Sequence, residues 1–253
     1  MPDLDKDVDK TAVAARFSDA AQRYEQAAHV QKEAAARFDA WLARQVAAEP
    51  ASIVEIGCGT GLLTRLLHRR YPRARLHATD LAPAMVAACR AASADAPNLE
   101  FSVCDGRDAR FDPAPDWVVS AMCFQWFDPL RDVLAHHLAS SGVLAFSIVL
   151  DGSFSAWRVA HERAGMEPGL LACPNHQQLL RVCQGLGAAR VVSERVTINE
   201  WHANGLSFAH SLRAIGADRP RPGHAPVSLK PVLRQLAQGF DADYEIGFFL
   251  IEK

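Results

Sequence analysis

The chain has 253 residues, with 27 Lys and Arg against 29 Asp and Glu, which leaves a net charge of −2 at pH 7. Hydrophobic residues make up 49% of the chain and charged residues 22%, so it has enough apolar content to fill a core and is not a disordered protein. The near-neutral net charge argues against a protein that binds nucleic acid through a large excess of positive charge. The sequence also has no run of about 18 apolar residues that could span a membrane.

The first part of the chain is predicted to be helical. Apolar residues recur at helical spacing between residues 11 and 48, which indicates two or three amphipathic helices. Pro50 ends this helical stretch.

Residues 51–150 alternate short apolar strands with helices. The predicted strands are 52–56, 75–79, 99–103, 117–122 and 143–149, and the predicted helices between them are 62–70, 83–92 and 132–139. This alternation implies right-handed crossovers and a parallel, doubly wound sheet.

The regular alternation of strands and helices ends after residue 150. Helical patterns occur at 155–164, 176–186, 208–215 and 228–238, and strand-like alternation occurs at 191–200 and 244–251. A late hairpin interrupted by helices predicts a cap built onto the sheet. We therefore expect one domain over 1–253, divided into N-terminal helices (11–48), a ligand-binding core (51–150), cap elements with a sixth strand (151–240) and a last strand (244–252).

Three glycines at alternate positions, Gly57, Gly59 and Gly61, follow the first strand and precede the first core helix. Glycine allows positive φ and lets a ligand approach the backbone closely. Glu55 lies just before this loop, where its carboxylate would repel a pyrophosphate and favour a cationic ligand. The spacing also differs from the G-x-G-x-x-G of dinucleotide-binding proteins.

The next two strands also end in acidic residues. Asp80 lies 19 residues beyond Gly61, where a carboxylate can accept hydrogen bonds from both hydroxyls of a ribose. Taken alone, Asp80 can equally be the N-cap of the following helix. Asp105 and Gly106 follow the third strand, where a carboxylate can accept from an adenine amino group.

The pattern Glu-x-Gly-x-Gly-x-Gly, followed in order by Asp80 and Asp105, resembles the S-adenosylmethionine site of class I methyltransferases. The resemblance implies a Rossmann-like α/β fold with a seven-stranded, mostly parallel sheet and an antiparallel last strand. It also implies S-adenosylmethionine as cofactor, S-adenosylhomocysteine as product and no metal. The residues it assigns to the cofactor are Glu55, Gly57, Cys58, Gly59, Gly61, Asp80, Leu81, Met85, Asp105, Gly106, Gln31 and Ala121.

Four further stretches narrow the family. They are similar to motifs of the malonyl-acyl carrier protein O-methyltransferases of biotin synthesis, the BioC family. The stretches are residues 17–25, Gln125 with Trp126, residues 152–154 and residues 211–217. The resemblance implies methylation of the free carboxylate of a malonyl group on acyl carrier protein or coenzyme A. Residues 172–176 depart from the family's His-x-Asn-x-Phe-like pattern.

A malonyl carboxylate is already ionised at pH 7, so the reaction needs no general base. Alignment of the reactants and exclusion of water would then supply the catalysis, and no catalytic Cys, triad or metal is expected. A guanidinium is suited to hold the carboxylate. Arg213 is the first candidate and Arg16 the second, although each can equally be a solvated surface arginine.

Three more residues are expected near the transferred methyl group. Tyr24 lies on an N-terminal helix, and Gln125 and Trp126 follow the fourth strand. Helix packing is the alternative for Tyr24, and plain core packing is the alternative for Trp126.

The expected partner, a carrier protein, is acidic and would meet a basic patch. The cluster proposed for this docking is Arg213, Arg219, Arg221 and His224. The polar N-terminus and six cysteines without a close pair predict a cytoplasmic protein with reduced thiols. Two alternatives stay open: a methyltransferase for a small-molecule carboxylic acid or natural product, and a silent methyltransferase-like domain.

Overall fold

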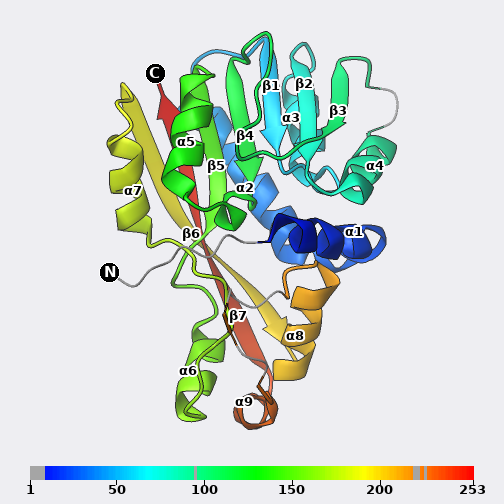
Figure 1. The fold of residues 1–253 in the computed structure, drawn as a ribbon, viewed down its shortest axis with the longest axis vertical. Coiled ribbons are helices and arrows are strands. Elements are labelled where there is room, and N and C mark those ends of the chain that lie inside the picture. The colour runs from blue at the N-terminus through cyan, green and yellow to red at the C-terminus, as the bar shows by residue number, and fades with distance from the viewer. Residues whose placement is uncertain (1–8, 94–95, 219–222, 225–226) are drawn as a thin grey trace.

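The computed structural model describes residues 9–93, 96–218, 223–224 and 227–253 (Figure 1). The strands are β1 (Ser52–Ile56), β2 (Arg75–Asp80), β3 (Leu99–Val103), β4 (Trp117–Ala121), β5 (Val143–Val149), β6 (Arg190–His202) and β7 (Phe240–Glu252). The helices are α1 (Lys10–Ala27), α2 (His29–Gln45), α3 (Leu62–Arg70), α4 (Pro83–Ala92), the short 3₁₀ helix η1 (Phe124–Trp126), α5 (Leu130–Ala139), α6 (Ser155–Arg163), α7 (His176–Gln184), α8 (Gly205–Ala214) and α9 (Lys230–Gln235). No helix in these ranges is long and apolar enough to cross a membrane.

The strands form one seven-stranded sheet in the order β3-β2-β1-β4-β5-β7-β6. Strands β1 to β5 run parallel, and β7 runs antiparallel to both of its neighbours. The expected fold class is therefore confirmed. Strand β5 is buried along its whole length, as its sequence, apolar except for Ser147, predicts, because helices cover both faces of such a sheet. Helices α2 and α3 lie on one face, and α5 and α7 on the other (Figure 1).

The hairpin of β6 and β7 is longer than the rest of the sheet. Strand β5 pairs with β7 only from Ile246 to Glu252, whereas β6 pairs with β7 along its full length, from Phe240 to Glu252. The unpaired half of the hairpin projects beyond the sheet and carries α6, α8 and α9, which form the cap (Figure 1). Strand β7 thus begins four residues earlier than expected. Helix α7 lies within the segment expected to be cap, but it packs on β6, β7 and α5.

Helices α1 and α2 have different roles. Helix α2 packs on β6 and β7 through Phe38 and Trp41, which are buried against Phe248. Helix α1 lies across the carboxyl edge of the parallel strands and contacts α4 of the core and α8 of the cap (Figure 1). It therefore closes the space between the two halves of the molecule.

The stability of the α2 interface can be tested at Trp41. The Trp41 ring lies 5.7 Å from that of Phe248 and is 1% exposed, so Trp41→Ala should lower the free energy of unfolding by about 3–5 kcal/mol in urea titrations. Trp201→Ala serves as the control, because Trp201 is 66% exposed and should lose less than about 1 kcal/mol. Equal losses in both variants would contradict this account of the core.

Candidate active site

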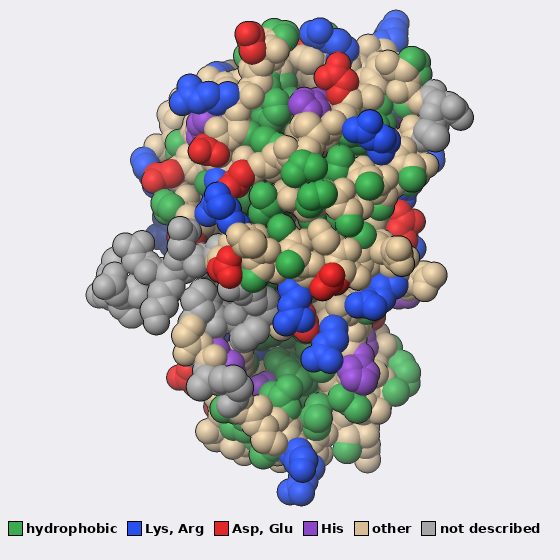
Figure 2. All heavy atoms as spheres, turned by 45° about the vertical axis from the view of Figure 1, so that its right-hand side comes forward, with side chains coloured by type: hydrophobic (Ala, Val, Ile, Leu, Met, Phe, Trp, Pro, Cys, Tyr) green, Lys and Arg blue, Asp and Glu red, His purple; other side chains and the backbone are tan. Residues whose placement is uncertain are grey.

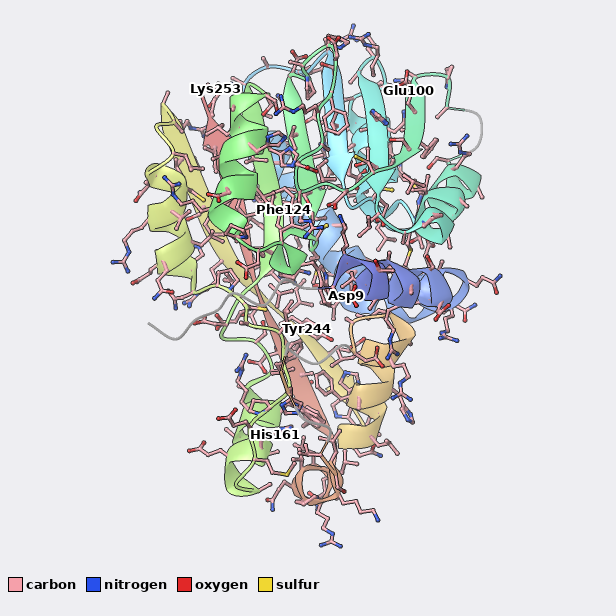
Figure 3. All side chains as sticks on the ribbon, viewed as in Figure 1. Asp9, Glu100, Phe124, His161, Tyr244 and Lys253 are labelled. Atoms are coloured by element: carbon pink, nitrogen blue, oxygen red, sulfur yellow. The ribbon has the colours of Figure 1, made fainter. Side chains whose placement is uncertain are left out.

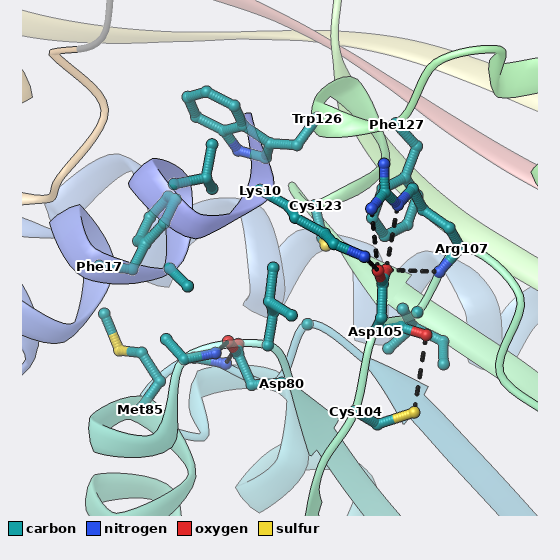
Figure 4. A pocket seen from close by; sticks show the side chains of 18 of the residues that line it. Lys10, Phe17, Asp80, Met85, Cys104, Asp105, Arg107, Cys123, Trp126 and Phe127 are labelled. Carbon is teal, nitrogen blue, oxygen red and sulfur yellow. Dashed lines mark hydrogen bonds and ion pairs between the residues drawn. The ribbon is translucent and has the colours of Figure 1, made fainter. Parts of the chain in front are cut away.

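Three cavities adjoin at the carboxyl edge of the sheet. The upper cavity, about 100 Å³, lies between α1 and the ends of the parallel strands (Figure 4). The lower cavity, about 500 Å³, lies between α1, η1 and the cap. The glycine-loop cavity, about 40 Å³, lies beside β1 and α2. Tyr24 and Met122 line all three, so the cavities meet at these two side chains.

The glycine loop needs its glycines for two reasons. Gly57, Gly59 and Gly61 have φ values of 74°, 54° and 90°, in the left-handed region that side chains disfavour. A Cβ at Gly57 would also lie 2.4 Å from Sγ of Cys123. The amides of Gly57 and Cys58 both donate to the carbonyl oxygen of Thr79 on β2. The loop is thus held against the sheet while its surface stays open to the cavities.

Glu55 is buried on β1 and borders the glycine-loop cavity. Its Oε2 accepts a hydrogen bond of 2.6 Å from the Thr64 hydroxyl. Burial raises the pKa of Glu55 to about 8, and Cys89 and Asp80 act in the same direction, while the Thr64 hydrogen bond opposes them. A cation bound nearby would favour the ionised form, so the site gains from a positively charged ligand.

Asp80 ends β2 and faces the upper cavity. Its two oxygens accept backbone hydrogen bonds from Gly59 at 2.9 Å and Ala82 at 2.8 Å. Burial raises the pKa of Asp80, although these backbone hydrogen bonds oppose the shift. The alternative role as N-cap does not hold, because the N-cap of α4 is Ala82.

Asp105 faces the same cavity but is paired with two cations that the sequence did not suggest. Lys10 Nζ lies 3.1 Å from Oδ2, and the Arg107 guanidinium lies 2.9 Å from the same oxygen (Figure 4). Burial disfavours the ionised carboxyl, but the hydrogen bonds from Arg107 and Lys10 outweigh it and lower the pKa of Asp105 to about 2. Asp105 is therefore an ionised hydrogen-bond acceptor at the wall of the cavity.

Aromatic side chains separate the upper from the lower cavity. Phe17 of α1 and Trp126 of η1 line both, and their rings meet edge to face at 5.6 Å (Figure 4). Burial raises the pKa of Tyr24 well above its usual range, with a further contribution from Asp80, so the phenol is neutral at pH 7. The two alternatives for Tyr24, packing within the N-terminal helices and lining the site, therefore do not exclude one another.

Polar groups at this junction come from Gln31 and Gln125. Gln31 lines the lower and the glycine-loop cavities. Gln125 Nε2 donates to the carbonyl oxygen of Met122 at 2.6 Å, whereas its buried Oε1 has no partner within the described residues. Met122 has a φ of 50°, a strained value for a side-chain residue, which turns the chain into η1. An unsatisfied buried acceptor suits a ligand that donates hydrogen bonds.

The lower cavity is walled by the cap and β7. Tyr244 lies at the waist of the molecule and His161 in the cap (Figure 3), and both line this cavity. Hydrophobic side chains reach the surface of the cap in Figure 2, bordered by basic side chains and histidines. Arg213 lines the cavity from α8 but is 69% exposed, and its Nε lies 3.1 Å from Oδ2 of Asp218.

Most of the expected site residues meet at these cavities. All of those assigned to cofactor or acceptor line one of them except Gly61, which is the N-cap of α3, and Arg16, the second candidate for the acceptor carboxylate, which lies outside the cavity linings and pairs with Asp218. Of the expected docking cluster, Arg219 and Arg221 lie outside the described residues, and His224 lines the lower cavity. In the described part of the chain, His, Cys, Asp and Glu side chains nowhere gather in threes as a metal site.

The residues that sequence reasoning missed fall into two groups. Arg107 had a local signal, because it follows Asp105 by two residues. Lys10 had none, since 95 residues separate it from Asp105. The same holds for Cys123, whose contact with the glycine loop depends on the packing of β4 beside β1.

Comparisons with known proteins agree with this geometry. The family model described as "Methyltransferase domain" matches residues 53–142. The chain is 34% identical over 244 residues to the biotin biosynthesis bifunctional protein BioCD of Bordetella avium, covering 94% of this chain and about half, 51%, of that protein. It is 32% identical over 213 residues to a malonyl-acyl carrier protein O-methyltransferase of Magnetococcus marinus, covering 79% of this chain and 78% of the relative.

Solved structures share the fold at low sequence identity. Magnesium protoporphyrin IX methyltransferase of Synechocystis, solved with bound S-adenosylhomocysteine, superposes with a TM-score of 0.63 over 97% of this chain and 100% of that one, at 14% identity.

Glu55→Gln should flatten the dependence of stability on pH. Folding raises the pKa of Glu55 from 4.5 to about 8, so the protonated form stabilises the folded state fully below pH 4.5, and this contribution is lost as the pH rises to about 8. Relative to Glu55→Gln, the wild type should lose about 1.4 kcal/mol per pH unit in that window. Urea unfolding without ligand at pH 5, 6, 7 and 8 measures this slope. The exposed Glu162→Gln is the control, and parallel curves for wild type and Glu55→Gln would refute the assignment.

Proposed function

Since the chain belongs to the malonyl-acyl carrier protein O-methyltransferase family, we propose that it methylates the free carboxylate of a malonyl group on acyl carrier protein, a step of biotin synthesis. The observation that carries the proposal is the meeting of two different cavities at Tyr24 and Trp126. The upper cavity is lined by carboxylates at the ends of parallel strands. The lower cavity is large and mostly apolar, and it has room for an acyl chain.

S-adenosylmethionine supplies a methyl group on a cationic sulfur, which becomes the neutral thioether of S-adenosylhomocysteine after transfer. The residues present fit this donor. Asp80 would hold the ribose, and Asp105 with Gly106 the adenine. Glu55 and Gln31 would border the cationic amino-acid end, where the positive φ of the glycine loop opens the backbone to a ligand. The buried, unpartnered Oε1 of Gln125 offers a further acceptor at the junction.

The chain's own groups suit an alignment mechanism. The acceptor carboxylate is ionised at pH 7 and needs no base. Burial raises the pKa of Cys123 above its usual range, as it does for Tyr24, so neither side chain is a thiolate or phenolate nucleophile near the junction. The edge-to-face pair of Phe17 and Trp126 places apolar ring surface at the point where the cavities meet, which would help to exclude water when both reactants are bound. Orientation of two bound reactants in such a dry site contributes roughly 7–11 kcal/mol to lowering a barrier.

Arg213 remains a proposed contact of the acceptor carboxylate. It could take this role only by exchanging Asp218 for the substrate. A cytoplasmic location and the lack of nucleic-acid and membrane partners also stay predictions from the sequence.

The methyl acceptor can be identified directly. The protein is incubated with methyl-labelled S-adenosylmethionine and, in separate reactions, malonyl-acyl carrier protein, malonyl-coenzyme A, malonate and acetyl-acyl carrier protein. Label should appear on the malonyl thioesters, with carrier protein preferred, and not on the acetyl form, because that acceptor lacks a free carboxylate. Label on malonate alone would indicate a small-molecule methyltransferase, and no label on any acceptor would indicate a silent domain.

A further inference from the structure

The lower cavity contains few charges. Among the described residues that line it, the Arg and Asp side chains are Arg158 of α6, Arg213 of α8 and Asp218. His161 and His224 add imidazole rings, and burial lowers the pKa of His161, which keeps that ring neutral at pH 7. The rest of the described lining is apolar or uncharged, so within the described residues the two guanidinium groups are the candidates to hold an anionic acceptor.

Arg213 is already paired with a carboxylate, which it shares with Arg16. Its Nε and the Nη1 of Arg16 lie 3.1 Å and 3.5 Å from the same oxygen of Asp218, which is 15% exposed. A carboxylate that approached Arg213 would meet the like charge of Asp218 and would have to displace it. Both arginines are also more than half exposed, so water screens their attraction.

Arg158 is in the opposite situation. Its Nε donates to the carbonyl oxygen of Ser153 at 2.9 Å, and within the described ranges it forms no ion pair. Its two Nη groups are therefore available for the parallel hydrogen bonds that a guanidinium makes with a carboxylate. The side chain is partly buried, which reduces solvent screening of its charge.

The first turn of α6 is anchored, and this holds Arg158 in place. The amide and hydroxyl of Ser155 donate to Oδ1 of Asp243 at 2.8 and 2.9 Å. The Ser153 hydroxyl bridges the backbone N–H and carbonyl of Glu245 at 3.0 and 3.1 Å. Both anchors belong to β7, so the guanidinium is tied to the sheet and does not depend on a loop.

The titratable neighbour that faces Arg158 does not neutralise it. Cys173 lines the same cavity, and burial raises the pKa of its thiol to about 11, although the positive charge of Arg158 opposes the shift. The thiol is thus uncharged at pH 7. Arg158 therefore has no thiolate facing it in the cavity.

We propose that Arg158 binds the free carboxylate of the methyl acceptor in the lower cavity and selects the charged acceptor over neutral esters. The inference rests on the proposed carboxyl methylation. Methylation removes the charge that Arg158 binds, so the ester product loses this contact and leaves more readily than the substrate. One residue thereby favours both acceptance of the acid and release of the ester.

The test measures KM and kcat for Arg158→Gln and Arg158→Lys. Two acceptors are used: malonyl-acyl carrier protein, which carries the phosphate of its phosphopantetheine arm, and malonyl-N-acetylcysteamine, which has no phosphate. Arg158→Gln should raise KM about tenfold to a hundredfold for both, the loss expected for a charge-assisted hydrogen bond. Arg158→Lys should restore part of it. Calorimetry with S-adenosylhomocysteine should give wild-type affinity in both variants, which shows that the fold and the upper cavity are intact.

A binding measurement checks selectivity apart from turnover. The wild type should bind malonyl-N-acetylcysteamine more tightly than its methyl ester, and Arg158→Gln should remove that preference. Arg163→Gln is the matched control, because Arg163 is exposed at the end of the same helix and should leave KM unchanged.

Three results would overturn the inference. An unchanged KM in Arg158→Gln would remove the residue from the acceptor site. A rise only with malonyl-acyl carrier protein would assign Arg158 to the phosphate. A large rise in Arg213→Ala with none in Arg158→Gln would assign the carboxylate to Arg213. Failure of the wild type to methylate either malonyl acceptor would instead refute the proposed function, so the two failures are distinguishable.

Discussion

The packing of α1 across the carboxyl edge of the sheet is the contact on which the rest of the site depends. The helix touches α4 on the core side and α8 on the cap side, and it is a wall of both main cavities. Its first residue pairs with Asp105, Phe17 meets Trp126, and Tyr24 lies where the cavities join. Without α1 the acidic strand ends would open to water, and Asp105 would lose its ion pair with Lys10.

Charge is distributed unequally between the two main cavities. The upper cavity presents carboxylates, of which Asp105 is neutralised by cations, while Asp80 is held by backbone amides. The lower cavity presents a guanidinium, Arg158, without an ion pair among the described residues. Under the proposed function, a cationic donor would lie beside the carboxylates of the upper cavity and an anionic acceptor beside Arg158, and their charges would cancel when the methyl group moves. The proposed reaction would need little more from the protein than this separation and alignment of the reactants.

The length of the β6–β7 hairpin determines where the cap, and with it the proposed acceptor site, is attached. Because the hairpin extends past β5, the cap is attached to the same strands that complete the sheet. Hydrogen bonds to Asp243 and Glu245 fix the start of α6 to β7, so this part of the cap is held by the sheet. The upper and lower cavities therefore share one framework, although the cap that walls the lower cavity comes from the late part of the chain.

Local patterns in the sequence were sufficient for the strands and the core helices, while the residues assigned to the donor stay a prediction. Apolar runs specify buried parallel strands, and closely spaced glycines specify a positive-φ loop, because both depend on neighbouring residues alone. The acids Glu55, Asp80 and Asp105 could be placed together because parallel strands end at one edge.

The partners of charged groups could not be predicted this way. Whether an arginine is free or paired depends on which acid the folded chain brings to it. Arg213 meets Asp218, and Asp105 meets Lys10 from 95 residues away, whereas Arg158 meets a backbone carbonyl and no acid among the described residues. These pairings follow from the packing of α1 and the cap on the sheet, and burial then sets their strength.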